Sequence, residues 1–148
     1  RAMSAAPQER ARHTIVGVDP GRSKCGLAIV YADGERKSLE VVPTAQLGDR
    51  LEAEVRAADV DAICVGHATG SNAIVDMCAA RWPAIPRRVV DETNTTLEAR
   101  RLYYLDHPPR GLLRFIPRGL LVPDEPLDGY AALLIVRRSG TLPRTPKT

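Results

Sequence analysis

Residues 14–42, TIVGVDPGRSKCGLAIVYADGERKSLEVV, decide the first half of the fold. The apolar run 14–19 ends at an Asp-Pro-Gly turn, and a second apolar run follows over 24–32. The Asp-Gly dipeptide at 33–34 is a strong hairpin signal, and it leads into a third run over 35–42. This stretch therefore predicts a meander of three antiparallel strands.

After this meander the pattern changes to helices that alternate with strands. A leucine or valine every fourth residue over 44–58 predicts an amphipathic helix, and the compact apolar run 62–67 is typical of a buried parallel strand. The other expected elements are a helix over 70–81, a strand over 87–91, a helix over 95–106 and a final helix over 127–138.

This order of elements predicts an α/β fold. We expect a mixed five-stranded sheet, with three antiparallel strands and then two parallel ones, and with helices on both faces. That is the layout of the ribonuclease H-like fold. Because 148 residues are about one domain's worth of chain, we expect a single domain over 13–138, with flexible tails at 1–12 and 139–148. The proline-rich residues 107–126 predict a long connection inside that domain.

The helix expected over 95–106 has a marked start. Thr95 and Glu98 fit a capping box, with Thr95 as the N-cap and Glu98 three residues later. The pattern places Leu97, Leu102 and Leu105 on the apolar side of this helix.

The composition is that of an ordinary globular protein, with 44% apolar and 26% charged residues. No apolar stretch approaches the ~18 residues of a transmembrane helix, and no apolar signal-peptide core is present. We therefore expect a cytoplasmic protein that does not bind membranes. Cys25, Cys64 and Cys78 form no CxxC pair, so we expect reduced, buried thiols. The net charge of +3 mildly favours an anionic partner.

Carboxylates follow two predicted strands and open the last helix. Asp19 ends the first strand, Asp91 and Glu92 end the fifth, and Asp128 lies in the first turn of the final helix. Each has an ordinary explanation: a turn residue, a solvated strand end, or an acid favoured by the helix dipole. Asp19, Glu92 and Asp128 together, at one end of the sheet, would repel one another without a cation between them. Hard oxygen ligands favour Mg²⁺ or Mn²⁺, and such a site suits hydrolysis of phosphodiesters.

Several further side chains are candidates for the same chemistry. Lys24 is a candidate to neutralise a phosphate, although a strand-edge lysine is the ordinary alternative. His67 is a candidate acid–base group, Ser71 a candidate anion contact at a helix start, and Asp91 a candidate assistant to the metal ligands. The aromatic side chains fit either base stacking or packing: Trp82, Tyr103, Tyr104 and Phe115.

Four blocks of sequence resemble the motifs of the YqgF/RuvX family. Residues 19–28, DPGRSKCGLA, resemble its opening D-x-G-x-x-R-[IV]-G-[LV]-A. Val-Gly at 65–66 resembles its fourth-strand glycine, and DETNTTLEA at 91–99 resembles D-E-R-x-[ST]-T-x-E-A. DGYAA at 128–132 resembles the closing D-x-x-A-A. The blocks follow one another in the family's order and cover most of the chain.

The resemblance implies a ribonuclease H-like fold related to Holliday-junction resolvases. It implies a divalent-metal-dependent nuclease with Asp19, Glu92 and Asp128 as catalytic and metal-binding residues. The usual family role is 5′-end processing of pre-16S rRNA, a structured RNA, within ribosome biogenesis. Cleavage of branched DNA by a Holliday junction resolvase is the other family proposal.

The chain departs from the family pattern at several positions. Thr93 replaces an arginine, Lys24 replaces another, residues 66–68 read Gly-His-Ala for Gly-Leu-Pro, and residues 123–126 replace a basic segment. These changes bear on substrate preference more than on fold. Three arginines spaced four apart in the long connection are the candidate replacement as substrate contacts: Arg110, Arg114 and Arg118.

Two other classes of function remain open. A catalytically inactive nucleic-acid-binding module agrees with the changes at Thr93 and Lys24, while the three retained acids count against it. A sugar-kinase-like ATPase would need two domains, for which 148 residues are too few. The sequence does not distinguish a monomer from a homodimer.

Overall fold

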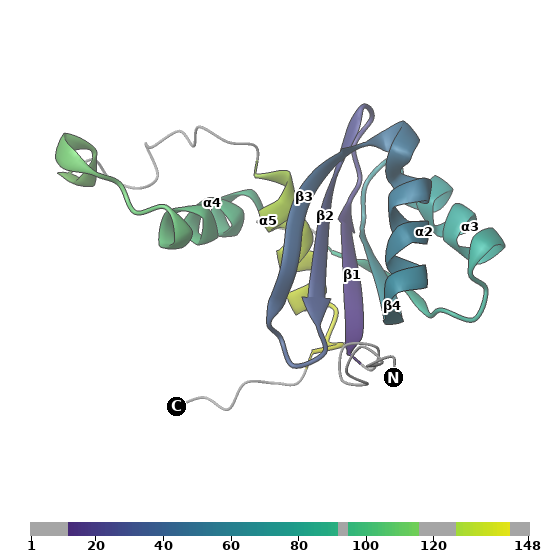
Figure 1. Ribbon diagram of the computed structural model, residues 1–148. Helices are drawn as coiled ribbons and strands as arrows, with labels where there is room; N and C mark the ends of the chain where they lie inside the picture. Colours follow the sequence, from purple (N-terminus) through teal and green to yellow (C-terminus); the bar gives the residue numbers. More distant parts are fainter. Residues whose placement is uncertain (1–11, 92–94, 116–126, 143–148) are drawn as a thin grey trace, which may run out of the picture.

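A computed structural model describes residues 12–91, 95–115 and 127–142 of the chain (Figure 1). Its centre is one five-stranded sheet with the strand order β3-β2-β1-β4-β5. The strands are β1 (His13–Asp19), β2 (Lys24–Tyr31), β3 (Arg36–Pro43), β4 (Asp59–Gly66) and β5 (Arg87–Val90). β1, β2 and β3 pair antiparallel, whereas β4 runs parallel to β1 and to β5. This mixed α/β sheet has the strand order and directions of the ribonuclease H-like fold, as predicted.

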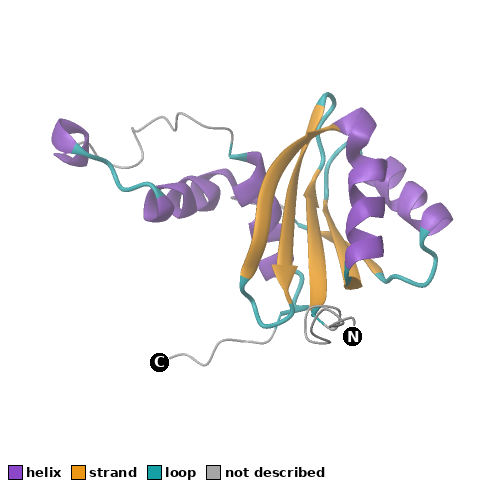
Figure 2. Cartoon of the chain, viewed as in Figure 1, coloured by secondary structure: helices purple, strands orange, loops and turns teal. Residues whose placement is uncertain are grey.

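Helices cover both faces of the sheet, which confirms the second part of that prediction (Figure 2). The helical elements are η1 (Thr44–Gln46), α2 (Leu47–Ala57), α3 (Ser71–Arg81), α4 (Thr95–Asp106), η2 (Gly111–Phe115) and α5 (Asp128–Arg138). α2 and α3 lie on one face, α5 lies on the other, and α4 packs outside α5.

The alternation of side chains along the strands divides the interior into two apolar cores. The core under α2 and α3 contains Val16, Val18, Leu27, Ile29, Ile63 and Val65 with Leu47, Leu51, Ile74, Cys78 and Trp82. The core under α5 contains Ile15, Ala28, Val30, Ala62, Cys64 and Val90 with Ala132, Leu133, Ile135 and Val136. Full burial of each large aliphatic side chain contributes about 1.5–3 kcal/mol.

The buried face of α4 differs from the predicted one. Leu97 and Leu105 are 61% and 65% exposed, so placing them on the apolar side was wrong. α4 packs mainly on α5. The narrow face of α4 that α5 covers carries aromatic side chains instead of these two leucines. That contact consists of Ala99, Tyr103 and Tyr104 with Tyr130 and Leu134, and Leu102 is partly buried beside it.

Several smaller expectations are also tested by the packing. The three cysteines are free and buried as predicted, and burial raises the pKa of the Cys78 thiol. Leu142 is partly buried against the core under α5. Within the described ranges, no helix is long and apolar enough to cross a membrane.

Candidate active site

Asp19 is the last residue of β1 and is half-buried. Its neighbour Val18 points into the core under α2 and α3, so alternation along the strand directs Asp19 to the face that α5 covers. Gly17 on that same face lies against α5, because a Cβ atom there would be 2.4 Å from the carbonyl oxygen of Ala132. Asp19 therefore stands at the end of β1 on the side of α5.

The start of α5 lies against the same end of the sheet. Gly26 on β2 is the register partner of Asp19, and a Cβ atom on Gly26 would lie 1.9 Å from the carbonyl oxygen of Asp128. Only a residue without a side chain leaves room for this approach. The structure thus brings Asp19 and Asp128 to one end of the sheet, from sequence positions more than a hundred residues apart.

The Asp128 carboxylate has one buried oxygen atom and an ammonium group nearby. Its Oδ2 atom is buried and accepts no hydrogen bond from any residue that the structure describes. The ammonium nitrogen of Lys24 lies 3.6 Å from this oxygen. The position in the first turn of α5 also favours a negative charge, because the helix dipole is positive there. A buried carboxylate oxygen without a hydrogen bond is costly, so this atom suits a cation as partner.

Asp19 and Asp128 fit a hard divalent cation such as Mg²⁺ or Mn²⁺. Both offer carboxylate oxygens, and the buried Oδ2 of Asp128 has lone pairs that no described donor uses. The predicted third ligand, Glu92, lies outside the described residues. Among the residues that are described, no three His, Cys, Asp or Glu side chains form a cluster that could hold a metal.

Asp91, the predicted assisting residue, is exposed just beyond β5. Its carbonyl oxygen accepts a hydrogen bond of 3.4 Å from Arg138, whose other guanidinium nitrogen lies 3.0 Å from the carboxylate of Glu98. Arg138 therefore links the residue before Glu92 to both α4 and α5. The sequence offers no signal for this role, since Arg138 reads as an ordinary C-terminal helix arginine.

His67 lies in the loop from β4 to α3, and Ser71 is the first residue of α3. His67 is exposed, and its main-chain N–H donates to the carbonyl of Val90 at 2.8 Å, which aligns the ends of β4 and β5. The Ser71 hydroxyl is buried; it accepts from the Ala68 N–H at 2.6 Å and lies 2.5 Å from the carbonyl oxygen of Gly66. The Ser71 hydroxyl is thus engaged with the main chain of the preceding segment.

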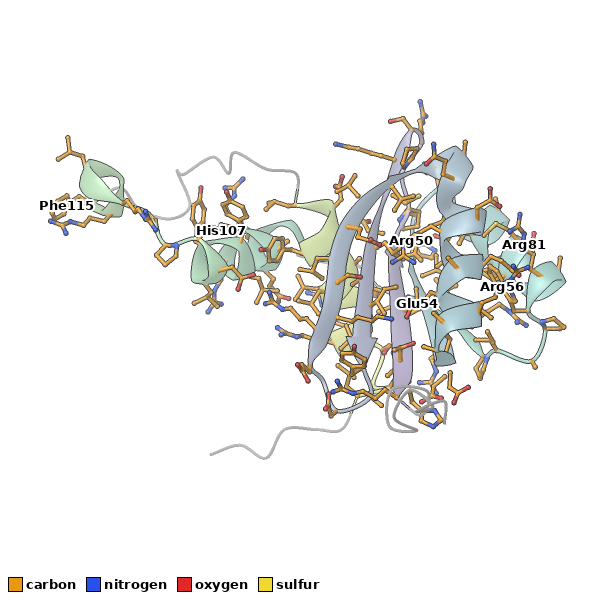
Figure 3. The ribbon with its side chains drawn as sticks, viewed as in Figure 1. Arg50, Glu54, Arg56, Arg81, His107 and Phe115 are labelled. Atoms are coloured by element: carbon orange, nitrogen blue, oxygen red, sulfur yellow. The ribbon has the colours of Figure 1, made fainter. Side chains whose placement is uncertain are left out.

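The predicted substrate contacts divide into two groups. Lys24 lies at the carboxylates, as described above. Arg110 is exposed beside η2, and the Arg114 guanidinium lies 4.9 Å from the centre of the Phe115 ring. Figure 1 shows η2 beyond the end of α4, away from the sheet, and Figure 3 shows Phe115 at its tip. Arg118 lies outside the described residues.

The aromatic candidates also separate. Trp82, Tyr103 and Tyr104 are buried at 6–8% exposure, so they pack in the interior. Phe115 on η2 is 72% exposed, so its ring is available to a binding partner.

The fold defines the chain as a ribonuclease H-like α/β protein. No protein-family model matches it, and no curated protein matches it. Among solved structures, it is similar to T. thermophilus RuvC in complex with a Holliday junction substrate. The two share 16% sequence identity over 88% of this chain and 98% of that chain, with a TM-score of 0.48.

Two longer proteins give similar values. Archaeoglobus fulgidus Pelota matches with 16% identity over 57% of this chain and a TM-score of 0.41. A ROK family protein from Streptococcus pneumoniae TIGR4 in complex with sucrose matches with 16% identity over 64% of this chain and a TM-score of 0.41. This chain spans only 28% and 39% of the lengths of those two proteins. At such identities the likeness concerns the fold alone.

Proposed function

We propose that this protein is a divalent-metal-dependent nuclease that hydrolyses phosphodiester bonds where β1 meets the start of α5. One observation carries the proposal: the buried Oδ2 of Asp128, which accepts no hydrogen bond from the described residues, lies at the same end of the sheet as Asp19. Burying carboxylate oxygen is unfavourable for a merely structural residue and suits one that binds a cation.

The proposed roles follow from this arrangement. Asp19 and Asp128 would hold Mg²⁺ or Mn²⁺, with Glu92 as the third ligand that the sequence motif suggests. A bound divalent ion activates water for attack on phosphorus and stabilises the departing oxygen. The Lys24 ammonium, 3.6 Å from Asp128, offsets part of the negative charge and would stand close to an incoming phosphate.

The proposed substrate is structured RNA, and the proposed role is 5′-end processing of pre-16S rRNA. The resemblance of residues 19–28, 91–99 and 128–132 to the YqgF/RuvX motifs supports this choice. Arg110 and Arg114 are solvent-exposed on and beside η2, with no acidic residue between His107 and Phe115, which suits a polyanion. Arg118 would extend this basic segment.

The test is cleavage of two labelled substrates with Mn²⁺: a structured RNA and a four-way DNA junction. We expect RNA cleavage by the wild-type protein and none by Asp19→Asn, while Asp49→Asn, an acid 89% exposed on α2, retains activity. Paired symmetric nicks in the junction alone would replace the RNA substrate by branched DNA. No cleavage of either substrate that depends on Asp19 would contradict the nuclease proposal and favour a nucleic-acid-binding module.

A further inference from the structure

The loop from β1 to β2, residues 20–23, connects Asp19 and Lys24, two residues of the proposed site. Arg22 stands in the middle of this loop. It is exposed, and it makes no hydrogen bond or ion pair with any part of the chain that the structure describes. Six of the other described arginines form ion pairs with carboxylates: Arg12, Arg36, Arg50, Arg56, Arg81 and Arg138.

Thr44, the first residue after β3, holds this loop on both sides of Arg22. Its main-chain N–H donates to the carbonyl of Ser23 at 2.9 Å, and its hydroxyl donates to the carbonyl of Gly21, also at 2.9 Å. These are the residues immediately before and after Arg22. The thiol sulfur of Cys25, fully buried, lies 3.4 Å from the same hydroxyl oxygen.

The loop itself leaves little freedom for its main chain. A Cβ atom on Gly21 would lie 2.1 Å from the carbonyl oxygen of Lys24, so the turn is tight. Pro20 restricts the chain just after Asp19, and its Cβ would lie 3.7 Å from a Cβ on Gly70 in the β4–α3 loop. The main chain that carries Arg22 is therefore ordered before any ligand binds, which reduces the entropy lost on binding.

The charges at this site favour a basic side chain in the loop. A cluster of carboxylates repels a polyanionic substrate, and Lys24 already lies beside Asp128. A guanidinium group forms paired hydrogen bonds with phosphate oxygens, which an ammonium group does not. Arg22 offers such a group three residues after Asp19.

We propose that Arg22 binds a backbone phosphate of the nucleic-acid substrate, and that Thr44 is the positioning residue that presents it. The proposal rests on the nuclease function proposed above. It assigns a substrate contact to a residue that the sequence motifs leave unspecified.

The first test compares Arg22→Gln, Arg22→Lys and Arg56→Gln. Arg56 is the control because its side chain is 78% exposed and it lies in the last turn of α2, at the opposite end of the sheet (Figure 3). Affinity for a fluorescein-labelled RNA hairpin is measured by anisotropy in EDTA over a range of salt concentrations. We expect Arg22→Gln to weaken binding about tenfold. The salt slope, which is the slope of log affinity against log salt concentration, should become less steep by about 0.7–0.9. Arg22→Lys keeps the slope and loses part of the affinity, whereas Arg56→Gln changes neither.

The second test is a double-mutant cycle with Thr44. Thr44→Val removes the hydroxyl while keeping the shape, so we expect weaker RNA binding, and Thr44→Ser restores it. Adding Arg22→Gln to Thr44→Val has less effect than Arg22→Gln alone, because both changes remove the same contact. Full additivity of the two effects would overturn the positioning role, because a general loss of stability does not depend on Arg22.

The outcomes separate this inference from the nuclease proposal. If the wild-type protein cleaves RNA and Arg22→Gln matches Arg56→Gln in affinity and salt slope, the role of Arg22 is wrong. If no cleavage occurs but Arg22→Gln weakens binding as expected, the nuclease proposal fails and the phosphate contact stands.

Discussion

Gly26 and Asp128 are in direct main-chain contact: a Cβ atom on Gly26 would lie 1.9 Å from the Asp128 carbonyl oxygen. Because Gly26 is also the register partner of Asp19, this contact determines how far the start of α5 stands from the end of β1. The separation of the two proposed metal ligands thus depends on a residue that carries no side chain.

Gly26→Ala is expected to separate the two carboxylates. The added methyl group must displace the first turn of α5, which costs about 1–3 kcal/mol of stability and weakens Mn²⁺ binding and cleavage. Gly34→Ala is the control, since its φ of +97° also makes alanine unfavourable but it lies in the β2–β3 turn with open space around it. Unfolding in urea and Mn²⁺ titration measure both effects. Equal Mn²⁺ affinity in the two folded variants would show that the contact does not organise the site.

Reversing the charges of the basic segment is expected to weaken nucleic-acid binding without affecting the fold. The triple change of Arg110, Arg114 and Arg118 to glutamate should lower affinity and flatten its dependence on salt concentration, because fewer counterions are released. A filter-binding titration at several salt concentrations measures this. An unchanged affinity and slope would mean that this segment takes no part in binding.

Asp106 is expected to contribute to stability in a pH-dependent manner. Burial alone would raise its pKa, but hydrogen bonds from Arg36 at 2.5 Å and Tyr130 at 2.8 Å lower it below the ordinary value. The contribution is therefore present above the unfolded pKa of about 3.9 and is lost as the pH falls through the lower folded value. The stability difference between the wild type and Asp106→Asn should be constant near neutral pH and shrink in acid, as measured by urea unfolding. A difference that does not change with pH would contradict the ion pair.

Glu54 on α2 should be important for stability although it lies outside the site. Its side chain is 4% exposed, 2.9 Å from the Lys37 ammonium and 3.7 Å from the Arg50 guanidinium (Figure 3). Glu54→Gln removes charge-assisted hydrogen bonding between α2 and β3, so we expect a loss of about 1.5–3 kcal/mol in the free energy of unfolding. The exposed Asp49→Asn should change it by no more than about 0.5 kcal/mol. Similar values for both variants would show that the buried cluster adds nothing.

The fold was predictable because its signals are local. Alternation and apolar runs identify the strands, and the Asp-Gly turn joins the antiparallel strands β2 and β3. The buried face of α4 was not predictable in this way, because Leu97 and Leu105 match a helical spacing but α4 is covered mainly by α5. Which stripe of a helix is buried depends on that partner.

The site was predictable only in part. The positions of Asp19 and Asp128 at one end of the sheet follow from strand direction and helix order. The contacts of Gly26 and Thr44 depend on tertiary register, which pairs Lys24 with Pro43 and so brings Thr44 to the β1–β2 loop. No periodicity in the sequence contains that information. The role of Glu92 stays a prediction, as do those of His67 and Asp91.

The most direct test of the central claim is Mn²⁺ binding, followed by electron paramagnetic resonance of the free ion. The wild-type protein should bind Mn²⁺ saturably, and Asp128→Asn should lose that binding while remaining folded, because Asn keeps the shape of the side chain. Asp49→Asn should bind as the wild type does. Equal saturable binding by the wild type and Asp128→Asn, or no saturable binding by the wild type, would contradict a metal site at the junction of β1 and α5.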